Sequence, residues 1–119
     1  MKILIVESDP HTQKLFQSIL SREGHTVLFS PAGSAGLFSA KQYAPDLILL
    51  DVPLLDSDGM QFLQKLRAVP ETETVPVLIL IAKLQSDTML KYIQAGASAC
   101  LDKPFRIHQL LAQVEALRR

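Results

Sequence analysis

Short apolar runs recur along the chain, and each is followed by polar or charged residues. The strongest runs cover residues 3–6, 47–50 and 75–81. Runs of this length are too short for buried helices and are typical of strands that are covered on both faces. A weaker, alternating segment at 25–29 predicts a strand at the edge of a sheet, and the small residues at 97–101 predict a further strand.

Between these strands, apolar residues recur at helical spacing. Helices are predicted over residues 10–23, 34–43, 60–69, 86–95 and 107–117, the fourth of them capped by Ser86 or Asp87. The residues expected to face the core are Leu15, Phe16, Ile19, Leu20, Leu37, Phe38, Tyr43, Phe62, Leu63, Leu66, Val69, Met89, Leu90, Ile93, Ile107, Leu110, Leu111, Val114 and Leu117. Regular alternation of strands and helices predicts parallel βαβ units with right-handed crossovers.

Composition narrows the class of protein. A chain of 119 residues with 48% hydrophobic and 20% charged residues is typical of one globular domain, which we expect to span residues 1–119. Twelve basic and twelve acidic residues balance without forming a basic stripe, so we expect no nucleic-acid binding by this domain. The single cysteine, Cys100, fits a reducing compartment. No stretch approaches the roughly 20 apolar residues of a membrane span, so we expect a cytoplasmic domain without membrane contact.

Groups capable of chemistry follow several of the predicted strands. Glu7, Ser8 and Asp9 follow the first strand, Asp51 follows the third, and Lys103 follows the fifth. The carboxyl ends of parallel strands meet at one edge of a sheet, where ligands bind in open α/β folds. Acids from two strands and one lysine could together hold a hard divalent cation and a phosphoryl group.

Across essentially its whole length, the chain resembles the receiver domain of two-component response regulators. The resemblance rests on five motifs in a fixed order, namely ILIVExDP, DLILLD followed by DxDG, VPVLILxAK, AGA and KPF. It implies a flavodoxin-like (βα)5 doubly wound sandwich with the strand order 2-1-3-4-5. It also implies a phosphoprotein in phosphorelay signal transduction, with a histidine kinase or phosphotransfer protein and an output domain or partner protein as its partners. The resemblance leaves open whether the domain forms a homodimer.

The resemblance assigns roles to individual positions. Asp51 corresponds to the aspartate that accepts the phosphoryl group, and Lys103 to the lysine that pairs with the phosphoryl oxygens. Pro104 corresponds to a proline that usually follows a cis peptide bond. Glu7 corresponds to the first member of an acidic pair, so Mg²⁺ would be held by Glu7, Asp51 and the carbonyl group of Pro53.

Other positions depart from the family pattern. Ser8 stands where a second acid should bind Mg²⁺, and Ile81 where a hydroxyl should donate to the phosphoryl group. Loss of that donor costs on the order of 1–3 kcal/mol. Cys100 stands where a switch aromatic residue is usual. Pro53 lacks an N–H group, and Leu55 replaces the usual proline of this loop. We therefore expect weakened metal binding and switching.

Two alternatives follow from these departures and from the fold class. The first is a pseudo-receiver that acts as a protein–protein interaction module without phosphorylation. The second is a flavodoxin-like enzyme or nucleotide binder, whose first turn should be rich in glycine, serine and threonine. The turn Glu7–Pro10 is acidic and contains no glycine, so we expect that the domain is not an enzyme.

The remaining polar residues have simpler interpretations. We expect Asp9 to cap a helix rather than to bind metal, and Cys100 to be a small core residue. Asp56 and Asp58 are interpreted as solvated turn residues. The three histidines, His11, His25 and His108, show no ligand spacing and are expected at the surface or at an edge.

Overall fold

Five strands alternate with five helices within residues 1–54, 56 and 58–118, the part of the chain that the computed structural model describes. The strands are β1 (Lys2–Val6), β2 (Thr26–Ser30), β3 (Leu47–Asp51), β4 (Val77–Ala82) and β5 (Ala99–Lys103). The helices are α1 (Pro10–Arg22), α2 (Gly33–Tyr43), α3 (Gly59–Arg67), α4 (Ser86–Gln94) and α5 (Ile107–Ala116). Each predicted element is present, with ends that differ by one to a few residues.

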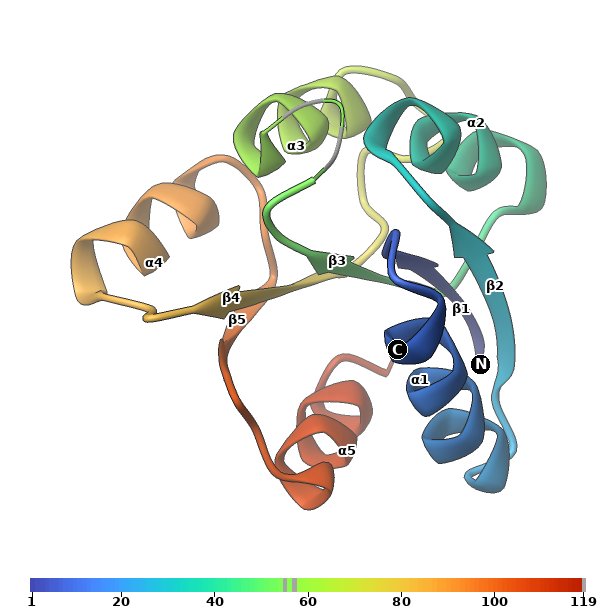
Figure 1. The fold of residues 1–119 in the computed structure, drawn as a ribbon. Helices are drawn as coiled ribbons and strands as arrows, with labels where there is room; N and C mark the ends of the chain where they lie inside the picture. Colours follow the sequence, from blue (N-terminus) through green and yellow to red (C-terminus); the bar gives the residue numbers. More distant parts are fainter. Residues whose placement is uncertain (55, 57, 119) are drawn as a thin grey trace.

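The strands form one parallel sheet in the order β2-β1-β3-β4-β5 (Figure 1). Leu4 of β1 pairs with Leu28 of β2 on one side and with Ile48 of β3 on the other. The weakly apolar strand β2 lies at an edge, as its alternating pattern predicts. This arrangement confirms the expected flavodoxin-like (βα)5 sandwich. It also brings the ends of β1, β3, β4 and β5 to one edge of the sheet.

Helices cover both faces of the sheet, with α1 and α5 on one face and α2, α3 and α4 on the other (Figure 1). Successive residues of a strand point to opposite faces. Ile3 and Ile5 therefore join the core beneath α1 and α5, whereas Leu4 and Val6 join the core beneath α2 and α3. Because both faces of the central strands are covered, these strands consist of unbroken apolar runs.

Several residues expected in the core are exposed instead. In α4, Met89, Leu90 and Ile93 are 43%, 56% and 40% exposed, and Tyr92 is the buried residue of the helix. The large residues Leu15, Phe38, Tyr43 and Ile107 are also exposed. Each of these helices packs on the sheet through a narrow strip of its surface, and the exposed apolar side chains lie outside that strip.

Two local interpretations were also wrong. The N-cap of α4 is Gln85, and it makes no side-chain capping hydrogen bond; Asp87 instead accepts from the backbone N–H of Thr88 at 2.9 Å. His25 is buried rather than at the surface, with 6% of its area exposed. Its Nδ1 lies 3.0 Å from the amino group of Met1, and its Nε2 lies 3.9 Å from a carboxylate oxygen of Glu115.

The surroundings of His25 lower its pKa. Burial is the first cause, followed by the positive charges of the Met1 amino group and Arg118, while Glu115 and Glu23 oppose the shift. The ring is therefore neutral in the fold, with Nδ1 as an acceptor for the Met1 amine.

Among the helices of the described residues, none is both long enough and apolar enough to cross a membrane.

Candidate functional site

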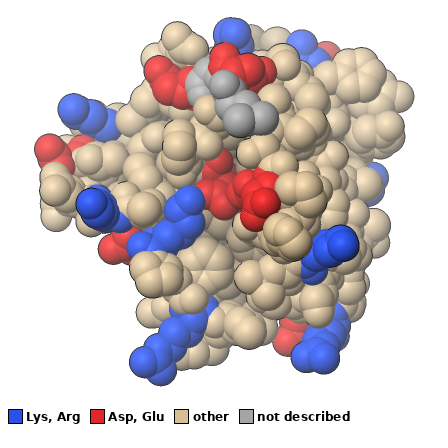
Figure 2. Space-filling view, viewed as in Figure 1, with Lys and Arg blue, Asp and Glu red and all other residues tan. Residues whose placement is uncertain are grey.

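The predicted site residues meet at the carboxyl edge of the sheet. Asp51 is the last residue of β3, Glu7 follows β1, and Lys103 is the last residue of β5. Acidic side chains gather near the centre of the face shown in Figure 2, with basic side chains beside them. Neighbouring strands lie about 5 Å apart, so residues at the ends of β1, β3 and β5 are within reach of one another through their side chains.

Lys103 contacts Asp51 directly. Its Nζ donates to Oδ1 of Asp51 and, at 3.2 Å, to the backbone carbonyl of Val52. One strand, β4, separates β3 from β5, and the long lysine side chain crosses its end. The Asp51 side chain is only 10% exposed, whereas that of Lys103 is 28% exposed. The pair is partly shielded from water, so its attraction is stronger than that of a surface ion pair.

Glu7 brings a second carboxyl group to Asp51. Its backbone N–H donates to the carbonyl of Ser30 at 2.9 Å, which fixes the chain after β1, and its Oε1 accepts from the N–H of Asp9 at 2.9 Å. Burial, followed by the hydrogen bond to Asp51, raises the pKa of Glu7 to about 7. The Glu7 carboxyl group is therefore partly protonated near neutral pH, because burial and the neighbouring Asp51 both oppose its negative charge.

The residues after Glu7 are directed differently. Oδ2 of Asp9 accepts from the N–H of Thr12 at 3.1 Å and from its hydroxyl at 2.7 Å, so Asp9 caps α1 as expected. These hydrogen bonds lower the pKa of Asp9. Ser8 is exposed. Among the described residues, no group of three or more histidine, cysteine, aspartate or glutamate side chains is arranged to hold a metal ion.

The donor set at Asp51 is nevertheless suited to a hard divalent cation. Glu7 and Asp51 supply carboxylate oxygen ligands, and a cation between them would favour the ionised form of Glu7. Mg²⁺ commonly binds through one or two carboxylates and keeps several water molecules. These residues therefore fit Mg²⁺ as two carboxylate ligands, with the carbonyl of Pro53 as the third predicted donor.

The loop between β3 and α3 is tied to α2, and both turn aspartates have structural partners. Asp56 accepts from the N–H of Gly33 at 2.7 Å and from the N–H and hydroxyl of Ser34 at 3.0 and 2.8 Å. The hydrogen bonds with Ser34 are the main cause that lowers the pKa of Asp56 to about 2. The N-cap residue of α2 is Ala32, which has no side chain for capping, so Asp56 caps this helix from a distant segment.

Asp58 caps α3. Its Oδ1 accepts from the N–H of Gln61 at 2.7 Å. Asp56 and Asp58 are exposed loop residues as expected, but the expectation missed that each of them also caps a helix. The sequence carried a signal for Asp58, because an aspartate followed three residues later by glutamine is typical of a helix start. Leu55, expected to alter the path of this loop, lies outside the described residues. Cis peptide bonds precede both Pro53 and Pro104.

A cavity of about 260 Å³ adjoins the ion pair. It is lined by Val52 and Pro53, Gly59, Ile81 and Tyr92, together with Lys103. Ile81 is half-buried and presents only hydrocarbon to this space. Cys100 packs against the same core, and burial raises the pKa of its thiol. No motif in the sequence marks Tyr92 as a residue near the site.

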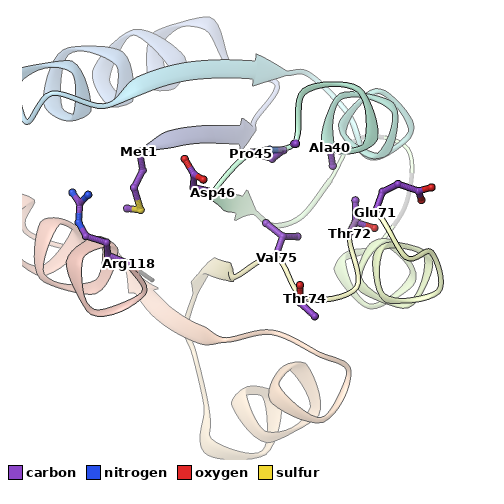
Figure 3. A pocket seen from close by; sticks show the side chains of 10 residues that line it. Met1, Ala40, Pro45, Asp46, Glu71, Thr72, Thr74, Val75 and Arg118 are labelled. Carbon is purple, nitrogen blue, oxygen red and sulfur yellow. The ribbon is translucent and has the colours of Figure 1, made fainter.

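A larger cavity, of about 450 Å³, lies at the opposite edge of the sheet (Figure 3). Met1, Asp46 and Val75, which line it, precede β1, β3 and β4 respectively. Asp46 is held there by the backbone N–H of Lys2, which donates to its Oδ2 at 2.7 Å. None of the predicted site residues lies in this cavity.

Comparisons with known proteins agree with this geometry. The family model of the response regulator receiver domain matches residues 3–115. The DNA-binding dual master transcriptional regulator RpaA of Synechocystis is 37% identical over 118 residues, which cover 99% of this chain and 49% of that protein. The chain spans about half the length of the curated relatives it matches.

Solved structures of receiver domains share the fold. The receiver domain of a sensor histidine kinase from Pseudomonas aeruginosa is 31% identical, with a TM-score of 0.87 and coverage of 98% of this chain and 95% of that one. It is described with a magnesium ion coordinated in the active site cleft. The BeF3-activated N-terminal receiver domain of Klebsiella pneumoniae RstA is 28% identical, with a TM-score of 0.90 and full coverage of both chains. The chain described here therefore belongs to the response regulator receiver domain family of two-component signalling.

Proposed function

We propose that the domain accepts a phosphoryl group on Asp51 from a histidine kinase or phosphotransfer protein. The observation that carries the proposal is the setting of Asp51, a shielded carboxylate at a strand end with a lysine ammonium on one oxygen and Glu7 beside it. An oxygen of Asp51 forms a bond to phosphorus while the P–N bond to the donor's histidine breaks. The imidazole leaves with the bonding electron pair and takes up a proton.

Lys103 has a defined part in this reaction. Its ammonium group already lies on Asp51 and on the carbonyl of Val52. When a phosphoryl group is attached to Asp51, the ammonium pairs with the new oxygens, where the negative charge then lies. The domain stores a phosphoryl group in this way and acts as a signalling module rather than as an enzyme with a separate substrate.

Mg²⁺ would be held by Glu7, Asp51 and the carbonyl of Pro53. When bound, it supplies positive charge that offsets the repulsion between the phosphoryl group and the carboxylates. Glu7 would then serve as a ligand in its ionised form. Ser8 offers only a neutral hydroxyl, so we infer that the metal is bound more weakly than by a site with a third carboxylate.

A second candidate function is a phosphorylation-independent interaction module. The observation that favours it is Ile81, whose hydrocarbon side chain lines the cavity beside Lys103 where a hydroxyl donor is usual. Ser8 and Cys100 are the other departures from the family pattern. In this case the Asp51–Lys103 pair is purely structural, and the domain acts through its surface alone.

Phosphorylation with a small donor distinguishes the two functions. The protein is incubated with acetyl phosphate and Mg²⁺, and the mass of the intact chain is measured. The first function predicts an adduct of one phosphoryl group that is stable in acid, labile in base and absent from Asp51→Asn. No adduct at millimolar Mg²⁺ contradicts it and supports the second function. If the double variant Ser8→Asp/Ile81→Thr then forms the adduct, those two positions are the cause.

The wider setting is also a proposal. Relatives such as RpaA are named as DNA-binding transcriptional regulators, and this chain matches about half of their length. We infer that the domain controls an output domain or partner protein, which makes the nucleic-acid contact where one exists. A homodimer is one form that such control can take. Light scattering of the chain before and after phosphorylation tests this directly.

A further inference from the structure

Helix α4 is anchored in the fold by a single buried side chain. Tyr92 is 8% exposed and is the buried residue of this helix. The other large apolar residues of α4, namely Met89, Leu90 and Ile93, are each at least 40% exposed. The position of α4 on the sheet therefore depends on where the ring of Tyr92 is seated.

The ring of Tyr92 is seated on the loop that carries the phosphoacceptor. A methyl group placed on the Cα of Gly59 would lie 3.0 Å from Cε1 and from Oη of Tyr92, and 2.9 Å from Cγ1 of Val52. The Tyr92 ring and the Val52 side chain thus meet over Gly59, at the start of α3. Val52 directly follows Asp51, and its carbonyl accepts from Lys103 at 3.2 Å.

The same ring borders the cavity beside the ion pair. Tyr92, Ile81 and Lys103 line this space of about 260 Å³. The ring therefore borders free space next to Lys103, into which it can move. Burial raises the pKa of its hydroxyl, and the nearby carboxylate of Asp58 adds to this shift.

We propose that Tyr92 is a positioning residue that couples the state of Asp51 to the position of α4. The proposal rests on the proposed function, because phosphorylation is the change at Asp51 that it would transmit. When the charge on Asp51 changes, the position of the Lys103 ammonium relative to the Val52 carbonyl changes, and Val52 shifts with the loop. The Tyr92 ring, which packs on Gly59 beside Val52, moves with them and carries α4. Cys100 has only a small thiol and cannot span this distance.

The coupling can be measured without phosphorylation. The chain contains two tyrosines, Tyr43 and Tyr92, so incorporation of 3-fluorotyrosine gives two ¹⁹F resonances. Tyr43 lies at the end of α2 and is 48% exposed, which makes it an internal control. In Asp51→Asn the Tyr92 resonance should shift and the Tyr43 resonance should not. Amide hydrogen exchange in α4 should change in the same variant.

Variants at Tyr92 separate coupling from packing. In Tyr92→Phe the ring remains, so α4 should still respond to Asp51→Asn; in Tyr92→Ala the response should be lost. Leu90→Ala, an exposed change on the same helix, should keep it. The proposal is overturned if the Tyr92 resonance of the wild-type chain does not move in Asp51→Asn, a result that needs no variant at Tyr92 to fold. It is also overturned if α4 responds equally in Tyr92→Ala.

Phosphorylation of the protein provides a second, independent experiment. With acetyl phosphate and Mg²⁺, the adduct is counted by mass and the Tyr92 resonance is recorded on the same sample. An adduct with an unmoved resonance contradicts the coupling and leaves the phosphoacceptor role intact. Absence of an adduct contradicts the phosphoacceptor role, while the comparison with Asp51→Asn still decides the coupling.

Discussion

A methyl group at Gly59 is expected to destabilise the fold from within the site. Gly59 is the first residue of α3, and the change tested is Gly59→Ala. The new Cβ would lie 2.9 Å from Cγ1 of Val52 and 3.0 Å from the ring and hydroxyl of Tyr92. Both neighbours are buried, with 3% and 8% of their areas exposed, so neither can turn into solvent to make room.

The opposing contributions can be compared. Overpacking of a buried site costs about 1–3 kcal/mol, and two rigid neighbours place this case at about 2–3 kcal/mol. Alanine restricts the unfolded chain and recovers about 0.4–1 kcal/mol. The net loss in the free energy of unfolding is then about 1–2.6 kcal/mol. With an m-value of about 1–3 kcal/mol/M, the urea midpoint falls by about 0.3–2.6 M.

Urea unfolding monitored by circular dichroism measures this difference. Gln64→Ala is the matched control, because it places alanine at an exposed position of the same helix and should change stability by no more than about 0.5 kcal/mol. Trimming the neighbour should relieve the crowding, so Gly59→Ala should cost clearly less in a Val52→Ala background than in the wild type. A Gly59→Ala protein as stable as the wild type, with an unchanged m-value, would refute the contact between α3, Val52 and Tyr92.

Three further changes test other parts of the fold. Leu110→Ala removes a fully buried side chain (0% exposed) from the core under α5 and should lower the free energy of unfolding by about 2–5 kcal/mol. Ile107→Ala, at a position that is 54% exposed, should lower it much less. A similar loss of stability in both variants would contradict the assigned face of the helix. The lowered pKa of His25 means that the unfolded chain binds the proton more tightly, so this residue should destabilise the fold as the pH drops through the ordinary value of 6.5 and below. The raised pKa of Glu7 acts in the opposite direction in the same pH range. Urea titrations from pH 8 to about pH 5 should therefore show the His25 contribution as the difference in slope between the wild type and His25→Gln, and equal slopes would contradict it. Asp56→Asn should speed amide exchange at Gly33 and Ser34, and unchanged exchange at both amides would mean that the α2 cap does not depend on this carboxylate. Ionised Asp56 stabilises the fold above its ordinary pKa of 3.8, and this stabilisation should be lost as the pH falls toward about 2.

The strands of the sheet could be predicted because the residue pattern that indicates each strand lies within that strand. Each central strand is covered on both faces, so its apolar run is unbroken and is followed by a polar end such as Glu7 or Asp51. The strand order was not contained in these patterns and came from the resemblance of the motifs to receiver domains. The capping role of Asp9 was also predictable, because the residue and its partner Thr12 are three positions apart.

The remaining errors concern contacts between distant segments. Asp56 and the N–H groups that it accepts from are more than 20 positions apart, with partners 22 and 23 residues away, and nothing in the spacing pairs them. In α4 the most apolar residues are exposed and a tyrosine is buried, because Gly59 leaves room for its ring beside Val52. His25 is buried because the amino group of Met1 and Glu115 of α5 lie beside its ring.

The charges around Asp51 connect two departures from the family pattern, Ser8 and Ile81, with different steps of the proposed reaction. A cation between Glu7 and Asp51 would favour the ionised form of Glu7, whose pKa is raised to about 7 by burial and by its hydrogen bond to Asp51. Ser8 therefore bears on metal affinity, because a neutral hydroxyl adds nothing to the attraction. Under the proposed function, Ile81 would bear on the phosphorylated state, because it lines the same cavity as Lys103 and offers no hydroxyl to a phosphoryl group. The two positions would then act at different stages, one before transfer and one after it. On this account restoring only the acid improves loading, and restoring only the hydroxyl improves how long the loaded state lasts.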